Sequence, residues 1–403
     1  MDIRDEAMQL RNEKHQMIKT GLNAKMENSH DLAVVYTPGV AAPCLAIKEE
    51  EDKSLELTWR GNVVAVISDG TRVLGLGDIG PAAAMPVMEG KSALYKRFGN
   101  IDAIPIVLNT KDKDEIVRTI RILEKSFAGI NLEDFSSPKC YDIEDELKAT
   151  MNIPVFHDDQ HGTAIAALAA VLGALRLIKK GIGEAKVAMF GAGAAGTAIA
   201  RLLLEDGVKP ENMTVLNSKG ILYDDGRLDR VQKELAKQVN PENRQGTFAD
   251  AVKGADILLA TSAPAAFKEM HKEAIKTMAE KNVVFAMANP IPEMMLSDAQ
   301  ELGVYVFGTG RSDMPNQVNN SSVFPGLFRG ALDVRARQIN EPMKLAAAHA
   351  LADLVSDEEL KPEYVVVDVF DPRVPHAVAK ASAKAAIESG VARVTKLPEQ
   401  YKD

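Results

Sequence analysis

A glycine-rich turn between two apolar segments is the feature that most limits how this chain can fold. The segment KVAMFGAGAAGTAIARLLLEDG starts at Lys186 and runs through mostly apolar residues into Gly191, Gly193 and Gly196. Glycines at this spacing allow a tight turn after a strand, close approach of backbone N–H groups to a phosphate, and close packing of the following helix. A second apolar run follows at 213–216. The segment therefore predicts a βαβ unit whose loop binds the pyrophosphate of a dinucleotide.

Two pairs of adjacent carboxylates precede this segment and suggest a metal site. Glu133-Asp134 lies in NLEDF, and Asp158-Asp159 lies in PVFHDDQHGT. Neighbouring like charges repel each other and lose hydration on burial, so a fold that gathers four carboxylates normally holds a cation. Ligands that offer only oxygen favour Mg²⁺ or Mn²⁺ over Zn²⁺. The alternative is that each pair is a solvated acidic turn.

A second glycine motif has the same spacing in a different context. Gly75, Gly77 and Gly80 also satisfy GxGxxG. Pro86 and Gly90 are expected to interrupt any helix that follows, so no crossover helix to a parallel strand is expected here. We therefore assign this loop to a substrate site.

Two histidines have the spacing of a helical zinc site. His157 and His161 are four residues apart, with an acid directly after the first. The preceding IPVF segment is typical of a strand, and Gly162 follows the second histidine at once, so one helix is not expected to hold both. A zinc hydrolase is therefore disfavoured, and both histidines are interpreted as local hydrogen-bonding residues.

Charge and cysteine content limit the class of protein. The 403 residues include 48 Lys and Arg against 57 Asp and Glu, a net charge of −9. Nucleic acids and anionic membranes attract basic surfaces, so neither is an expected partner. Cys44 and Cys140 are too few for a disulfide framework, and the N-terminal segment lacks an apolar signal core. The apolar run at 162–175 is shorter than the roughly 20 residues that span a bilayer. These properties favour a soluble cytoplasmic enzyme.

The pattern of apolar segments predicts an α/β protein with two domains. An N-terminal α/β domain is expected over residues 1–161, and a doubly wound Rossmann-type domain with C-terminal helices is expected over 162–403. Strands are expected at 63–68, 103–108, 186–190, 213–217, 256–260, 283–288 and 304–308. Helices are expected at 163–179, 331–356 and 376–389. The helices between the strands of the second domain predict a parallel sheet.

Eight motifs occur in an order that resembles one family. They are YTPGVAAPC at 36–44, LGLGDIG at 74–80, EGKSALY at 89–95, NLEDF at 131–135, FHDDQHGTA at 156–164, GAGAAG at 191–196, ANPIPE at 288–293 and NNSSVFPG at 319–326. Together they resemble malic enzyme in its short prokaryotic form, without a phosphotransacetylase-like extension. The resemblance implies an N-terminal substrate and metal domain, an NAD(P)-binding Rossmann domain whose last helix packs toward the first domain, and oxidative decarboxylation of L-malate to pyruvate and CO₂.

The resemblance also implies roles for individual residues. Lys91 would remove the hydroxyl proton of malate, which requires a pKa lowered by burial or by a nearby cation. Tyr36 would protonate the enolate carbon after CO₂ leaves. The implied substrate ligands are Arg72, Lys91, Asn289 and Asn320; the metal ligands are Glu133, Asp134 and Asp159, supported by Asp158; and the cofactor contacts are Gly191, Ala192, Gly193, Ala194, Ala195, Gly196, Asn217, Lys219 and Asn289.

Cofactor choice and the exact reaction stay open at this point. Asn217 stands where an NAD-preferring Rossmann domain usually has an acid, and Lys219 follows, which favours NADP over NAD. The resemblance suggests a homodimer. Pocket shape decides between malate and larger hydroxy acids such as isocitrate or tartrate. A malolactic enzyme that converts malate to lactate and a catalytically silent nucleotide-binding regulator are the alternatives; Lys91, Tyr36 and the acidic residues argue against the regulator.

Overall fold

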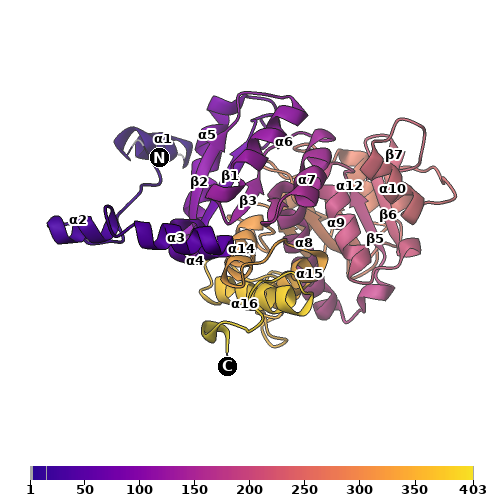
Figure 1. The fold of residues 1–403 in the computed structure, drawn as a ribbon. Coiled ribbons are helices and arrows are strands. Elements are labelled where there is room, and N and C mark those ends of the chain that lie inside the picture. Colours follow the sequence, from indigo (N-terminus) through magenta and orange to yellow (C-terminus); the bar gives the residue numbers. More distant parts are fainter. Residues whose placement is uncertain (1–2, 15, 403) are drawn as a thin grey trace.

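The first of two parallel sheets lies in the N-terminal half of the computed structural model, which describes residues 3–14 and 16–402 (Figure 1). Its strands are β1 (Val63–Ser68), β2 (Asp102–Val107), β3 (Gly129–Leu132) and β4 (Val155–His157), in the order β2-β1-β3-β4. Helices α5 (Pro81–Gly99), α6 (Lys113–Ile122) and α7 (Lys139–Thr150) connect successive strands. Every residue of β1 is buried, as expected for a parallel sheet covered on both faces.

The second sheet follows the glycine-rich turn and has the order β10-β9-β8-β5-β6-β7. Its parallel strands are β5 (Val187–Phe190), β6 (Met213–Asn217), β8 (Ile257–Ala260), β9 (Val283–Ala286) and β10 (Val306–Thr309). The short β7 (Gly220–Ile221) pairs antiparallel with β6 at the edge. Helices α9 (Ala194–Glu205), α10 (Arg230–Val239), α11 (Phe248–Val252), α12 (Glu269–Ile275) and α13 (Leu296–Glu301) complete this domain. The predicted strands and the doubly wound parallel sheet are confirmed.

Helix α8 (Asp158–Ile178) joins the two domains and begins earlier than the sequence predicts. The expected start at 163 is wrong because Gly162 does not end the helix; α8 starts at Asp158, directly after β4. By length and composition this helix could cross a membrane. However, 67% of its most apolar 18-residue segment is buried inside the protein, as expected for a core helix. The expected domain boundary between residues 161 and 162 falls inside it.

Helix α5 also departs from the prediction. It runs through Pro86 and Gly90 and leads to β2, which pairs parallel with β1. The expectation that no crossover helix follows the 74–80 loop is therefore wrong. Pro86 removes one backbone donor, but the apolar stripe that includes Ala84, Met88 and Tyr95 is fully buried, and this packing stabilises the helix.

The C-terminal helices pack against the first domain. They are α14 (Phe324–Asp333), α15 (Glu341–Ala352) and α16 (Arg373–Glu388). The single helix expected over 331–356 is wrong, because the chain leaves helical geometry between α14 and α15, where Arg335 has a φ of 51°. Tyr95 of α5 contacts Phe324 and Phe328 of α14, with ring centroids 4.6 and 5.4 Å apart. Helix α16 in turn packs on α14.

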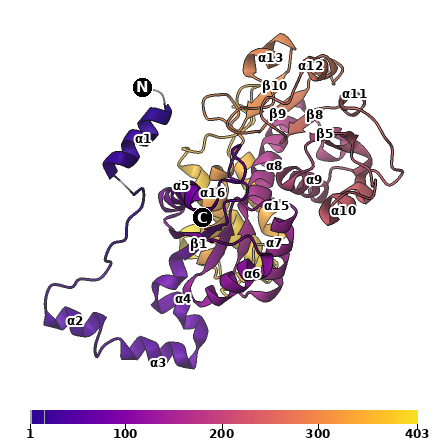
Figure 2. The ribbon, with the colours of Figure 1, turned by 90° about the horizontal axis from the view of Figure 1, so that it is seen from above.

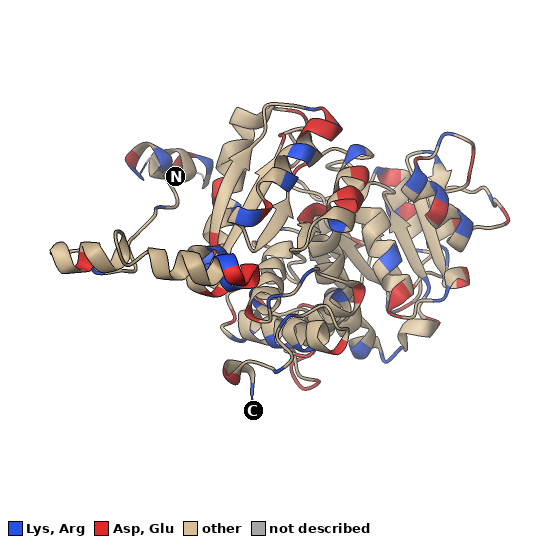
Figure 3. Ribbon diagram, in the orientation of Figure 1, with Lys and Arg blue, Asp and Glu red and all other residues tan. Residues whose placement is uncertain are grey.

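An N-terminal arm extends from this body, and its helices α2 (Ser29–Val35) and α3 (Ala41–Glu49) stand away from it (Figure 2). Helices α1 (Ile3–Lys14) and α4 (Ser54–Leu57) touch the body, where Arg11 pairs with Glu89 at 2.6 Å and Leu55 packs against the core. No described residue of these four helices is buried. Charged residues are sparse along α2 and α3 (Figure 3). Short isolated helices are marginal in water, and α2 and α3 lack the buried residues that normally stabilise such elements.

Candidate active site

The four acidic residues converge because β3 and β4 are neighbours in the first sheet. Glu133 and Asp134 directly follow β3, and Asp158 and Asp159 directly follow β4, whose residue His157 pairs with Leu132. Parallel strands end on the same edge, which brings the two pairs together. One carboxylate oxygen from each of Glu133, Asp134 and Asp159 lies within 4.8 Å of the others.

Backbone hydrogen bonds fix this cluster. The N–H of Asp134 donates to Asp159 Oδ2 at 2.8 Å, and the Asp134 carbonyl accepts the N–H of Arg72 at 3.0 Å. Asp134 has a φ of 58°, a left-handed conformation that is uncommon outside glycine. Such strained residues persist where surrounding contacts impose them, often at functional sites. The hydrogen bond from the Arg72 N–H to the Asp134 carbonyl places Arg72 beside the acidic residues.

The electrostatics of the cluster fit a divalent cation. Burial, together with the charges of Asp159 and Glu133, raises the pKa of Asp134 to about 9. Burial also raises the pKa of Asp159 to about 6. Asp134 Oδ2 is buried and has no hydrogen-bond partner within the described chain. Three crowded carboxylates with an unpaired oxygen are the donor set that Mg²⁺ or Mn²⁺ prefers.

Lys91 projects from α5 into this cluster. Its side chain is 7% exposed, its Nζ is 2.8 Å from Glu133 Oε1, and it also pairs with Asp158. The ammonium lies 4.4 Å from the centre of the Phe324 ring. Burial alone would lower the pKa of Lys91, but Asp158 and Glu133 outweigh burial and raise it above its ordinary value. Without a cation, the pKa of Lys91 is therefore raised, whereas proton abstraction by Lys91 requires a lowered pKa.

The predicted substrate ligands lie on loops around the cluster. A Cβ atom added to Gly162 would lie 3.0 Å from Asn320 Cβ and 1.9 Å from Asp158 Oδ1, so Asn320 is next to Asp158. A Cβ on Gly75 would lie 2.9 Å from the carbonyl oxygen of Asn289. The loop that carries Arg72 therefore meets the loop that carries Asn289, and the two domains contact each other at this point.

Tyr36 is not brought to the site within one chain. It is the C-cap of α2 and is 63% exposed. Helix α2 lies in the N-terminal arm, away from the two sheets (Figure 2). Lys91, by contrast, is buried in the body of the protein. The sequence does not reveal that Tyr36 and Lys91 are far apart within one chain, because motif spacing does not show where the N-terminal helices lie relative to the two domains.

The glycine-rich turn has the geometry that its sequence predicts. Gly191 has a φ of 116°, and a Cβ there would lie 2.7 Å from the Thr261 carbonyl oxygen. Gly193 is the N-cap of α9 and would meet no atom within 4 Å, which leaves room for a pyrophosphate. A Cβ on Gly196 would lie 1.7 Å from the Gly191 carbonyl oxygen, so only glycine permits this packing.

The flanking cofactor residues are also arranged around this turn. Ala194 and Ala195 begin α9, and the Ala192 carbonyl accepts the Gln232 side-chain amide at 2.8 Å. Because Gln232 lies on α10, the turn is tied to a second helix.

The end of β6 carries the residues expected to select the cofactor. Asn217 ends the strand, and its Oδ1 accepts the backbone N–H of Lys219 at 2.8 Å. The Lys219 side chain is 60% exposed, and its Nζ lies 3.9 Å from Asp225. Asp225 is held more closely by Arg227, at 2.6 Å. Lys219 is therefore available to a ligand phosphate, although an acid lies close by.

Sequence reasoning missed residues that hold the site in place. The Tyr95 hydroxyl donates to Asn131 Oδ1 at 2.8 Å, and Asn131 Nδ2 donates to Glu133 at 2.9 Å. Glu293 accepts the N–H groups of Ser262 at 2.6 Å and of Ala288 at 3.0 Å, which ties together the loops after β8 and β9. The sequence could have indicated these residues only by their position, because the family motifs contain Tyr95, Asn131 and Glu293.

Comparison with known proteins gives the family. Residues 12–148 match the family described as "Malic enzyme, N-terminal domain", and residues 160–388 match "Malic enzyme, NAD binding domain". The "Bifunctional malic/malolactic enzyme" of Bacillus subtilis (strain 168) is 50% identical over 99% of this chain and 97% of its own. The "NAD-dependent malic enzyme" of Geobacillus stearothermophilus is 48% identical over 94% and 79%. The crystal structure of malic enzyme from Pyrococcus horikoshii OT3 has a TM-score of 0.91 and 43% identity, covering 97% of this chain and 92% of that one. The chain belongs to the malic enzyme family, the NAD(P)-dependent enzymes that oxidatively decarboxylate malate.

Proposed function

We propose that Glu133, Asp134 and Asp159 hold one Mg²⁺ or Mn²⁺ ion that the oxidative decarboxylation of L-malate requires. The observation that carries this proposal is the convergence of three carboxylate oxygens within 4.8 Å beside the buried Lys91 ammonium. A bound divalent cation supplies a Lewis acid that stabilises negative charge on the keto oxygen as CO₂ leaves.

Lys91 accepts the hydroxyl proton of malate in this proposal. Asp158, Glu133 and Asp159 all raise the pKa of Lys91, with Asp158 contributing most. A bound cation would offset the charges of Glu133 and Asp159, and burial then acts toward the neutral amine, which is the form that can accept a proton. Arg72 can bind a substrate carboxylate through two parallel hydrogen bonds. Asn289 and Asn320 lie on the loops around the cluster and complete the substrate and nicotinamide contacts.

Tyr36 is the acid that protonates the enolate carbon, and we place it in the site of a second copy of this chain. The arm buries no described residue in its own body, yet Leu32, Val34, Tyr36 and Leu45 are 48–63% exposed. Exposed apolar residues gathered in one segment indicate an interaction surface. A homodimer in which the arms pack on partner bodies would bury this surface and supply each site with a tyrosine.

We infer that the enzyme accepts NADP and favours it over NAD. Asn217 carries no charge, so it does not repel a ribose phosphate, and the exposed Lys219 can attract one. The relative from Geobacillus stearothermophilus is named NAD-dependent, which counts against this preference. The test is the ratio of kcat/KM for NADP and NAD in the parent and in Asn217→Asp. A parent that prefers NAD tenfold, or an unchanged ratio in the variant, contradicts the inference.

A malolactic reaction is the second candidate, because the relative from Bacillus subtilis is named a bifunctional malic/malolactic enzyme. Purified protein should be incubated with L-malate, Mn²⁺ and each cofactor while reduced cofactor, CO₂, pyruvate and lactate are measured. Stoichiometric pyruvate and reduced cofactor support the leading proposal, whereas lactate without reduced cofactor supports the second.

The metal site has its own test in the same assay. Full malate turnover after chelation of the cation, or in Asp159→Ala, would overturn the metal site.

We place this enzyme in the cytoplasm. Cys44 is exposed and Cys140 is buried, and both are free thiols. Free thiols are the usual state in a reducing compartment.

A further inference from the structure

Behind the acidic cluster, one buried carboxylate accepts hydrogen bonds from four groups. Glu144 of α7 is 3% exposed. It accepts from Lys148 Nζ at 2.6 Å, His161 Nε2 at 2.8 Å, Gln160 Nε2 at 2.9 Å and the backbone N–H of His157 at 3.2 Å. Neither the catalytic roles nor the cofactor site described above uses this residue.

Three of these four donors surround Asp158 and Asp159 in the chain. His157, Gln160 and His161 belong to the end of β4 and the first turn of α8. The N-cap of α8, His157, makes no side-chain capping hydrogen bond. The amide of Gln160 also lies 2.9 Å from His157 Nδ1, so it links the residue before the acidic pair to Glu144. The first turn of α8 is therefore stabilised by hydrogen bonds to Glu144 of α7, and not by a side-chain N-cap.

Lys148 and the hydrogen bonds to Glu144 keep it ionised. Burial alone would raise the pKa of Glu144, but the contacts with His161 and Lys148 hold the pKa well below its ordinary value. Burial lowers the pKa of His161 to about 4, so near neutral pH His161 acts as a hydrogen-bond donor and Lys148 supplies the charge. On the far side of His161, Nδ1 lies 3.0 Å from Nζ of the buried Lys344, which also pairs with Glu341 at 2.7 Å. The network therefore connects α7, α8 and α15, and an unpaired group anywhere in it would be costly.

We propose that Glu144 is a positioning residue for the metal site: it fixes the first turn of α8 so that the Asp159 carboxylate faces Glu133 and Asp134. This inference rests on the metal site proposed above. Residues that orient metal ligands through hydrogen bonds typically change metal affinity 10- to 100-fold when they are mutated. A role in packing alone would lower the stability of the fold without changing the affinity of the folded protein for the cation.

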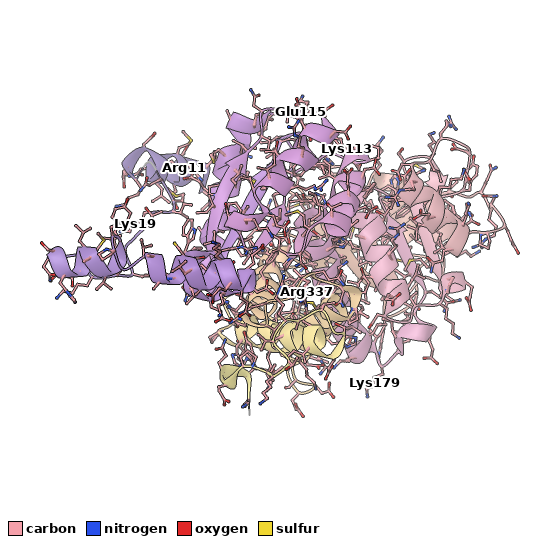
Figure 4. All side chains as sticks on the ribbon, in the orientation of Figure 1. Arg11, Lys19, Lys113, Glu115, Lys179 and Arg337 are labelled. Carbon is pink, nitrogen blue, oxygen red and sulfur yellow. The ribbon has the colours of Figure 1, made fainter. Side chains whose placement is uncertain are left out.

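The test is Mn²⁺ binding to Glu144→Gln, measured by the electron paramagnetic resonance signal of free Mn²⁺ without substrate. Glutamine keeps the side-chain volume but presents an N–H₂ group to donors that need an acceptor. We expect Mn²⁺ to bind about 10- to 100-fold more weakly, while the Kd of the dinucleotide stays within about twofold. The matched control is Glu146→Gln, two residues along α7. Glu146 pairs at 3.0 Å with Lys113, which lies on the outer surface (Figure 4), and this variant should bind Mn²⁺ like the parent.

Equal Mn²⁺ affinity in folded Glu144→Gln and the parent overturns the positioning role. If Glu144→Gln does not fold, Gln160→Ala decides the question, because it removes the side-chain contacts of Gln160 with Glu144 and with His157 Nδ1 without leaving a buried charge unpaired. Weaker Mn²⁺ binding in Gln160→Ala supports the proposal, and unchanged binding overturns it. A parent that binds no Mn²⁺, or an Asp159→Ala variant that binds it normally, instead overturns the metal site itself.

Discussion

At the residue scale, Gly162 shows that close packing in the site requires a residue without a side chain at this position. It lies in the first turns of α8, between the Asp158 carboxylate and Asn320. Asp158 is fully buried and is held by Lys91, so its carboxylate has little room to move. A glycine here lets the acidic turn, the lysine and the asparagine approach one another closely.

Gly162→Ala is predicted to impair both stability and catalysis. The new Cβ would lie 1.9 Å from Asp158 Oδ1, so Asp158 must turn away from Lys91. Overpacking of this kind costs on the order of 1–3 kcal/mol. We expect a lower Tm and at least a roughly tenfold lower kcat, since misplaced catalytic groups lose rate steeply. Gly90→Ala is the control: a Cβ there meets nothing within 4 Å, and alanine should stabilise the helix by roughly 0.5–1 kcal/mol. A Gly162→Ala variant as active and stable as the parent contradicts this account.

The sequence predicts residues whose chemistry is local and misses residues whose role depends on packing. Each glycine of the 191–196 turn has the geometry expected from its spacing, because that geometry is set within a few residues. The two acidic pairs suggest a metal site by their charge, but the assignment of Glu133, Asp134 and Asp159 as its ligands came only through the family resemblance. The raised pKa of Lys91 in the cation-free protein depends on Asp158 and Glu133, which are distant in the sequence, so motif reading alone does not show it.

At the scale of elements, tertiary packing decided where helices begin and end. Pro86 and Gly162 are local breaking signals, yet α5 and α8 continue through them because tertiary packing outweighs local propensity. Helix α5 packs against β1 and β2, and α8 packs against α9 and α15. The expected strands were confirmed because buried parallel strands are short, continuous apolar runs. Strand β3 was not expected, because its four residues begin with a glycine and include Asn131. The two-residue β7 has no such pattern, since it is defined only by its pairing with β6.

The contact between α9 and α15 is predicted to depend on pH. His349 Nε2 of α15 lies 2.6 Å from Oδ1 of Asp206, the C-cap of α9. This hydrogen bond raises the pKa of His349 above its ordinary value. The stabilisation is therefore fully present below the unfolded-state pKa of about 6.5 and is lost as the pH rises through the folded-state pKa.

His349→Gln tests this linkage. The variant should have a lower Tm than the parent at about pH 6 and the same Tm at about pH 9, measured by thermal unfolding. The expected loss is at most about 1 kcal/mol, because the side chain is 49% exposed and solvent screens the pair. A Tm difference that does not change with pH would mean that packing, not charge, is responsible.

At the scale of the whole molecule, the proposed homodimer concerns the arrangement of the arm and the body. The helices α1–α4 bury no described residue, and Tyr36, the proposed acid, is the C-cap of α2. Motif order placed Tyr36 and Lys91 in one site, but only the fold shows that one chain does not bring them together. The proposed homodimer with exchanged arms would bury the exposed apolar surface and would bring Tyr36 of one chain to Lys91 of the other.

Mixing two inactive variants tests this assembly. Lys91→Ala and Tyr36→Phe should each lose most activity as pure proteins. If the arms are exchanged, a heterodimer contains one intact site, in which Lys91 of one chain meets Tyr36 of the other. Equal mixing after dissociation and reassociation should then restore about a quarter of the parental activity, because half of the dimers are mixed and each has one good site. The control mixes Lys91→Ala with Asp159→Ala; both residues lie in the same body, so neither site of the heterodimer is intact and no activity should return. Recovery in neither mixture, with dimers confirmed by sedimentation, would place Tyr36 and Lys91 in the site of one chain.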